Sequence, residues 1–223
     1  MSIAEKLSQI AENEQKVFEA GKQKEQSDFW DVYQNKGKQM SNYANAFAYE
    51  HWNDINYNPK YDIRPAYSCN MMYYASNITD TKIALNITLC TQMDQVFRSA
   101  KKLRIIRKLI VKESSTYNYT FRDCEALEEI IFEGVIGQNI DFSYSPLLKV
   151  ESMIGTVATE EQIATGTNIL EFNGVYYYGG IFIALKDLTG TGETRTCTLG
   201  ATNLAKLTDE QKAIATDKGW TLA

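Results

Sequence analysis

Hydrophobic residues near the start of the chain recur at the spacing of one helical face. They lie four, three and seven residues apart, in a stretch rich in Glu, Gln, Lys and Ala, and they are Ile3, Leu7, Ile10 and Val17. These residue types favour helix, and this spacing forms one narrow apolar seam. We predict a helix that ends near Gly37, so that residues 1–38 form a helical attachment or oligomerisation segment.

Two interpretations of residues 1–38 stay open. The helix either lies on the body of its own chain, or forms a short bundle between subunits and is then a coiled coil. Two heptads are marginal in water, so a bundle would need further contacts with the body or with a partner protein. The expected assembly is a homo-oligomer, with a homotrimer as the first choice.

A second pattern, F-x-x-small-x-x-L, occurs three times in the centre of the chain. Its members include Phe97, Ala100, Leu103, Phe121, Cys124, Leu127, Phe142 and Leu148. The three motifs start 24 and 21 residues apart, which is the spacing of leucine-rich repeats. Such a repeat needs inward apolar residues at fixed positions and a small residue where successive coils approach. We therefore predict leucine-rich-repeat coils over residues 75–154, with parallel strands at residues 109–111 and 130–132.

Residues 39–74, between these two patterns, are dense in Tyr and Asn. Rings and amides together could form a sugar-binding platform. They could also form an irregular cap whose rings cover the end of a core. The sequence predicts a linker or cap here and leaves both roles open.

An Asn-Gly pair at positions 173 and 174 separates two apolar runs, residues 169–172 and 175–178. This arrangement is typical of a type I′ β-hairpin, because both turn positions need a positive φ. We assign residues 155–185 as a hairpin insert. The second run contains a candidate contact surface, Tyr176, Tyr177 and Tyr178. The hairpin could equally pad the body or join subunits.

Residues 186–223 predict a C-terminal cap. Thr208 and Gln211 have the spacing of a capping box, which indicates a helix that stops at Gly219. Residues 197–199 and 220–222 are predicted strands. The patterns together give the expected fold class: an α+β repeat fold with an N-terminal α-helix, a short leucine-rich-repeat solenoid with a parallel sheet, and a capping helix.

Composition narrows the function classes. Of the 223 residues 44% are hydrophobic and 23% charged, which permits a buried core. The formal net charge of -5 argues against nucleic acid as a partner. A basic cluster at residues 101–108 could contact an acidic cell-wall polymer or another subunit, but an exposed face of the coils is the simpler explanation. No run of apolar residues is long enough for a membrane span, and the first residues lack the apolar core of a signal peptide.

The residues that usually carry catalysis are sparse. His51 is the one histidine, and Glu50 and Asp54 beside it could make it a base, but no nucleophile motif accompanies it. The four cysteines form no C-x-x-C pair, so a zinc site is poorly supported. We expect no catalytic residues, no metal and no cofactor, and therefore a protein that is not an enzyme.

The segment FRDCEALEEIIFEGVIGQNIDF resembles BspA-type leucine-rich repeats. Together with MSIAEKLSQIAENEQKVFEAG, NYNPKYDIRP and the C-terminal LKDLTGTGETRTCTLGATNLAKLTDEQKAIATDKGWTLA, it makes the chain similar to phage and prophage proteins of Gram-positive, mainly gut, bacteria. The resemblance departs at about residues 155–182.

This resemblance implies a structural protein of the virion: a fibre or decoration component of tail, baseplate or head that is made in the host cytoplasm. It implies other virion proteins as partners, and a host-surface glycan or protein as a further one. The alternative is a bacterial leucine-rich-repeat adhesin or binding module, which would need a secretion signal or a wall anchor.

Overall fold

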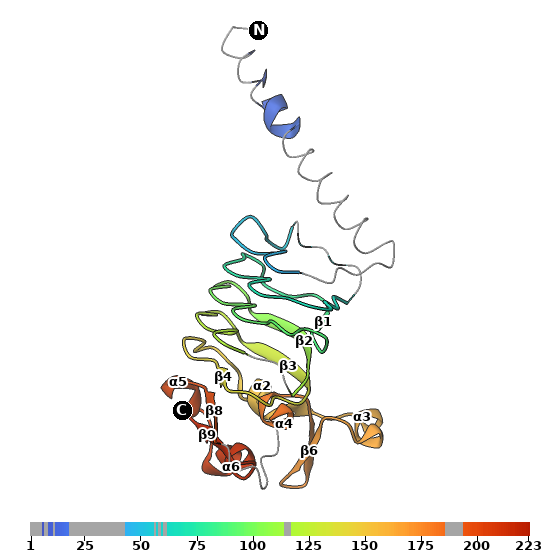
Figure 1. The fold of residues 1–223 in the computed structure, drawn as a ribbon, viewed down its shortest axis with the longest axis vertical. Coiled ribbons are helices and arrows are strands. Elements are labelled where there is room, and N and C mark those ends of the chain that lie inside the picture. Colours follow the sequence, from blue (N-terminus) through green and yellow to red (C-terminus); the bar gives the residue numbers. More distant parts are fainter. Residues whose placement is uncertain are drawn as a thin grey trace.

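The structure is a computed structural model of the 223-residue chain. It describes residues 6, 9–10, 12–17, 43–55, 57, 59, 62–113, 117–185 and 194–223. In this part of the chain, segments from residue 43 to residue 148 wind in successive turns that stack along the long axis of the molecule, and the C-terminal elements cover one end of the stack (Figure 1).

One parallel sheet runs along the stacked turns. It consists of β1 (Ala84–Asn86), β2 (Ile105–Val111) and β3 (Glu129–Gly134), in that order. Leu85 is paired with Leu109, and Leu109 with Phe132. This confirms the predicted parallel strands at 109–111 and 130–132, although both strands begin earlier than predicted because Ile105 and Glu129 already pair.

A column of aromatic rings fills the interior of the stack. It is formed by Phe47, Tyr73, Phe97, Phe121 and Phe142, which are all buried, and we call it the ring spine. Successive centroids lie 4.8 to 5.7 Å apart, and the ring planes are within 28° of parallel. Such offset stacking adds to the stability gained from burial, so each turn is anchored on its neighbours.

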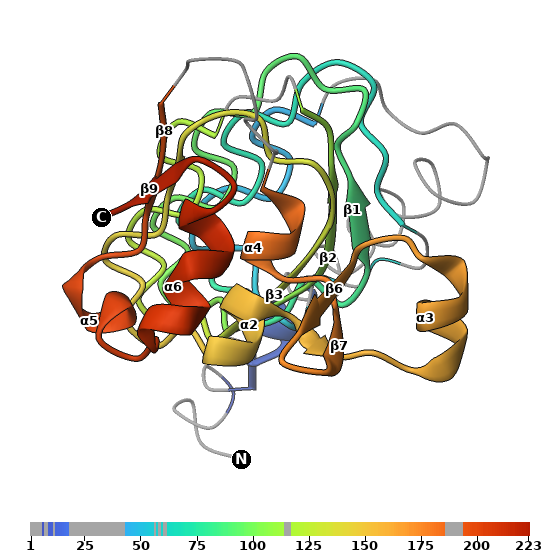
Figure 2. The same ribbon diagram turned by 90° about the horizontal axis from the view of Figure 1, so that it is seen from below.

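Two further sheets involve the C-terminal elements. The second is parallel, in the order β4 (Ile140–Asp141), β8 (Arg195–Thr198) and β9 (Trp220–Leu222). The third is antiparallel, in the order β5 (Thr156–Val157), β7 (Val175–Tyr178) and β6 (Ile169–Phe172). The helices of this region are α2 (Val150–Ile154), α3 (Glu160–Thr165), α4 (Ile181–Ala184), α5 (Ala201–Leu204) and α6 (Asp209–Thr216). Figure 2 shows α2, α4 and α6 across the end of the stack, with α3 at its side.

The predicted fold class is wrong. The sequence predicts a leucine-rich-repeat solenoid, whereas the described residues form nine short strands in three separate sheets, together with short helices. The chain is a mixed α/β fold. The physical reason is that the motif marks which side chains are buried at each turn, not how far the strands extend. It also ends at Leu148, after which α2 and an antiparallel sheet follow.

Two local predictions are confirmed. The hairpin of β6 and β7 has the predicted ends, with Phe172 paired to Val175 and positive φ angles of 52° at Asn173 and 77° at Gly174. Helix α6 begins with the predicted capping box, in which Thr208 accepts from the Gln211 amide and the Gln211 side chain accepts from the Thr208 amide. Helix α3, which carries its own capping box, was not predicted from the sequence.

The first predicted segment is only partly described. Ile3, Leu7 and Gly37 lie outside the described residues. Ile10 and Val17 lie in helical positions and are 54% and 73% exposed.

In the following segment, the rings of Tyr43, Phe47, Trp52, Tyr57 and Tyr73 are buried in the core cluster. Among the described residues of 39–74, this burial favours the cap over the sugar-binding platform.

Candidate functional site

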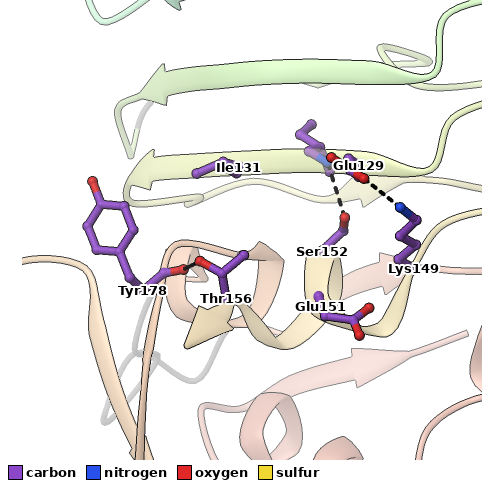
Figure 3. Close-up of a pocket in the computed structure, with 9 residues that line it drawn as sticks. Glu129, Ile131, Lys149, Glu151, Ser152, Thr156 and Tyr178 are labelled. Atoms are coloured by element: carbon purple, nitrogen blue, oxygen red, sulfur yellow. Dashed lines mark hydrogen bonds and ion pairs between the residues drawn. The ribbon is translucent and has the colours of Figure 1, made fainter. Parts of the chain in front are cut away.

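A cavity of about 440 Å³ opens where the outer face of β3 meets α2 and the hairpin. Its lining comes from four elements and the links between them: Glu129, Ile130, Ile131, Lys149, Glu151, Ser152, Thr156, Tyr178 and Gly180. Figure 3 shows Lys149 and Glu151 at one end of the cavity and Tyr178 at the other. The size is within the range of pockets that hold small ligands.

Glycines allow the hairpin to approach α2 closely. Gly155 ends α2 with a φ of 102°, and Gly180 precedes α4 with a φ of 95°. A Cβ atom added to Gly180 would collide with the backbone of Gly155. The wall between hairpin and helix therefore depends on the absence of a side chain at this position.

Charged groups define one end of the cavity. Lys149 Nζ lies 2.5 Å from Glu129 Oε1 and 3.8 Å from Glu128 Oε2. The hydrogen bond with Glu129 raises the pKa of the Lys149 ammonium, with burial acting in the opposite direction. Lys149 is therefore a cation at neutral pH, held beside a carboxylate that keeps acceptor capacity.

Serine and backbone groups fix the wall behind these charges. Ser152 Oγ donates to the Glu128 carbonyl at 3.0 Å and accepts from the Ile130 amide at 3.2 Å. Helix α2 is thereby tied to the start of β3, which holds the Glu129–Lys149 pair in place.

The other end of the cavity carries a tyrosine beside an ion pair. Tyr178 Oη donates to Glu133 Oε2 at 3.4 Å, and Lys108 forms an ion pair with the same Glu133. Burial, the largest single influence, lowers the pKa of Lys108, but the hydrogen bond and charge of Glu133 together with Tyr178 outweigh it, and the net shift of the pKa is upward. Thr156 Oγ1 donates to the Tyr178 carbonyl at 3.3 Å, which anchors β7 from the adjacent edge strand.

The three tyrosines predicted as a contact surface do not act together. Side chains alternate along a strand, so Tyr177 lies on the face opposite to Tyr176 and Tyr178. Tyr178 lines the cavity, Tyr177 packs against the core, and Tyr176 is exposed.

The predicted repeat residues are in the interior. The residues Phe97, Ala100, Leu103, Phe121, Cys124, Leu127, Phe142 and Leu148 are all buried in one hydrophobic cluster. They support the ring spine and contribute no group to the cavity.

The basic cluster at residues 101–108 is largely neutralised. Lys101 pairs with Glu125 at 2.6 Å, Arg104 with Glu128 at 2.9 Å and Arg107 with Asp80 at 2.5 Å, and Lys108 pairs with Glu133. Each pair joins neighbouring turns. The cluster therefore holds turns together and presents little free positive charge.

The four cysteines are free and buried. Burial raises the pKa of the Cys124 and Cys197 thiols well above the usual value. Cys124 Sγ donates to the Phe97 carbonyl at 3.1 Å, which suits a packing role. His51 is exposed, with its ring 5.9 Å from that of Trp52, and does not line the cavity.

Within the described part of the chain, no group of three or more His, Cys, Asp or Glu side chains is placed to hold a metal ion. No helix there is long and apolar enough to span a membrane.

The cavity was not predicted from the sequence. Glu129 belongs to an acidic run that reads as a solvated rim, while Lys149 and Ser152 carry no motif. A usable signal was the set of glycines at 155, 179 and 180, which bracket the hairpin insert.

Comparison of the chain with protein-family models, with curated proteins and with solved structures found no match.

Proposed function

We propose that this chain is a non-enzymatic structural protein of a phage virion that displays its stacked body for binding. Its place in the virion rests on the resemblance of its opening, central and C-terminal segments to phage and prophage proteins. Its role in binding rests on one observation, the preformed cavity between β3, α2 and the hairpin.

The lining of the cavity suits a sugar unit of a host-surface glycan. Glu129, Glu151 and Lys149 offer acceptors and donors for hydroxyl groups, and the Tyr178 ring offers an apolar face with a polar edge. The ion pair and the Ser152 bonds hold several of these groups in position before a ligand arrives. Pre-organisation of this kind reduces the entropy lost on binding.

The place in the virion is tested by mass spectrometry of purified particles. We expect the protein at a fixed copy number per particle. Its recovery in the cell-wall fraction of uninfected bacteria, and not in particles, would instead support the alternative, a bacterial adhesin or binding module.

The cavity is tested by glycan-array binding of the purified chain. Tyr178→Ala should remove the ring from the cavity and weaken binding about tenfold or more, since one good aromatic contact and its hydrogen bond are lost. Tyr176→Ala is the matched control, because it removes an exposed tyrosine of the same strand that does not line the cavity. Equal binding by the two variants would contradict the assignment.

A further inference from the structure

Four side chains form a continuous stack on three successive turns of the body. The guanidinium of Arg98 lies over the ring of Tyr119 at 5.6 Å, and that of Arg122 lies over the same ring at 5.4 Å. Arg122 also lies over the ring of Tyr144 at 5.6 Å. We call Arg98, Tyr119, Arg122 and Tyr144 the arginine–tyrosine ladder.

The ladder belongs to the turns at residues 94–99, 118–123 and 143–144. These turns stack on the side of the body away from β1, β2 and β3 (Figure 1). None of the four ladder residues lines the cavity described above, so the ladder is a separate surface.

The two arginines lack the close carboxylate partners that the basic residues near the sheet have. Arg98 Nη1 donates to Gln95 Oε1 at 2.9 Å, and the carboxylate of Asp123 lies 3.9 Å from Arg122 Nε. The Nε atoms of both arginines are buried and have no hydrogen-bond partner among the described residues, so an incoming ligand would meet the Nη groups. By contrast, Lys101, Arg104 and Arg107 pair at 2.9 Å or less.

The stack also presents ring surface to solvent. Tyr119 is 47% exposed and Tyr144 is 64% exposed. A tyrosine offers on the order of 200 Å² of contact area, so the two rings together expose roughly that amount. A stable protein interface needs about 800 Å² on each partner. A single row of four side chains therefore suits a narrow linear ligand better than a folded protein.

From these observations, we propose that the arginine–tyrosine ladder binds an anionic polysaccharide that carries carboxylate groups. The planar guanidinium groups would each take a carboxylate, which the Arg fork matches, and the exposed parts of the Tyr119 and Tyr144 rings would contact the sugar rings. Neighbouring turns lie about 4.8 Å apart, so a chain lying along the stack meets an arginine or a ring at each step. Binding at the ladder would require neither the cavity nor a place in the virion.

The test measures the affinity of the full chain for polygalacturonate oligosaccharides by calorimetry. A neutral glucan and poly-glutamate of equal length serve as comparison ligands. We expect binding to polygalacturonate that weakens as salt rises, with at least about tenfold weaker binding to both comparison ligands. Equal binding of the glucan would overturn the role of the carboxylate, and equal binding of poly-glutamate would overturn the polysaccharide. No binding to polygalacturonate would overturn the proposal.

Variants then locate the binding on the ladder. Arg98→Gln with Arg122→Gln should weaken binding about tenfold or more, and Arg122→Lys should also weaken it because the planar fork is lost. Tyr144→Ala, at the most exposed ladder position, is a second variant that leaves the core untouched. Arg104→Gln is the control, since it removes one positive charge from an ion pair near the sheet. A loss as large in Arg104→Gln as in the ladder variants would overturn the assignment.

Discussion

Small buried side chains decide how closely successive turns pack. Ala100, Cys124 and Ser145 take the same place in three successive turns, and all are buried. Ser145 Oγ donates to the Phe121 carbonyl at 3.0 Å, just as the Cys124 thiol donates to that of Phe97. This position therefore admits a small side chain that can also satisfy a carbonyl of the preceding turn. The motif predicted its small size, and only the structure shows the hydrogen bond.

Cys124→Leu should destabilise the fold by about 1–3 kcal/mol, because extra methyl groups in a close-packed position force neighbours apart. Cys124→Ser should cost less, since Ser145 shows that a hydroxyl fits the equivalent position. Urea unfolding followed by circular dichroism measures both. Equal stability of Cys124→Leu and the unchanged chain would mean that the turns are not in close contact here.

Burial also controls thiol reactivity. It raises the pKa of the Cys124 and Cys197 thiols, so both are protonated at pH 8 and closed to reagents in the folded chain. We expect iodoacetamide to modify neither residue at pH 8 until denaturant is added, as read by peptide mass spectrometry. Rapid modification of Cys124 in the folded chain would contradict the packing described here.

The carboxylate of Glu128 makes the stability of the fold depend on pH in the acid range. The hydrogen bond from Arg104 lowers the pKa of Glu128 in the folded state below its unfolded value. The stabilisation that this bond gives the folded state is therefore fully present above the pKa of Glu128 in the unfolded chain, about 4.3. It is lost as the pH falls through the lower pKa of the folded chain. Urea unfolding should show that the free energy of unfolding falls less between pH 7 and pH 3 in Arg104→Gln than in the unchanged chain. An equal loss would mean that the pair has no net effect.

At the scale of elements, prediction succeeded where local chemistry dictates the backbone. The Asn173–Gly174 turn and the Thr208 capping box each specify their element within a few residues. The candidate site was not predictable in this way. Glu129 and Lys149 meet only because α2 packs beside β3, and nothing local in either segment indicates that contact.

Thr208→Ala should cost about 1 kcal/mol of stability, because the side chain that accepts from the Gln211 amide is lost at the start of α6. Helix α6 carries the buried residues Ile214 and Ala215, so its fraying exposes the covered end of the stack. Urea unfolding measures this change in the free energy of unfolding. Thr159→Ala, at the equivalent position of α3, is the matched control and should cost less overall, because α3 has no buried residue.

At the scale of the whole molecule, the assignment of the fold class was wrong because the repeated motif covers only the middle of the chain. Phe97, Phe121 and Phe142 do stack as their spacing suggests. The architecture, however, is set equally by the segments that follow, which add an antiparallel sheet and extend a second sheet from β4 through β8 and β9. Sequence periodicity identified a buried column and gave no information on the elements that close its end.

The apolar seam near the start of the chain predicts the oligomeric state. Light scattering should give a trimer for the full chain and a monomer for a version that begins at Lys38. The reason is the apolar seam, of which Ile10 and Val17 are exposed in the structure of the single chain. A monomer in both cases would assign the helix to attachment on another protein.

The direction of the hydrogen bonds in the stack has a mechanical consequence. Backbone bonds such as Phe47 to Met72, Tyr73 to Val96 and Phe97 to Thr120 join neighbouring turns, and the turns follow one another along the long axis of the body (Figure 1). A load applied at the two ends of the body would act along these bonds and open them a few at a time. Such a body would yield by peeling turn after turn under modest force, and it would act as an extensible tether rather than a rigid strut.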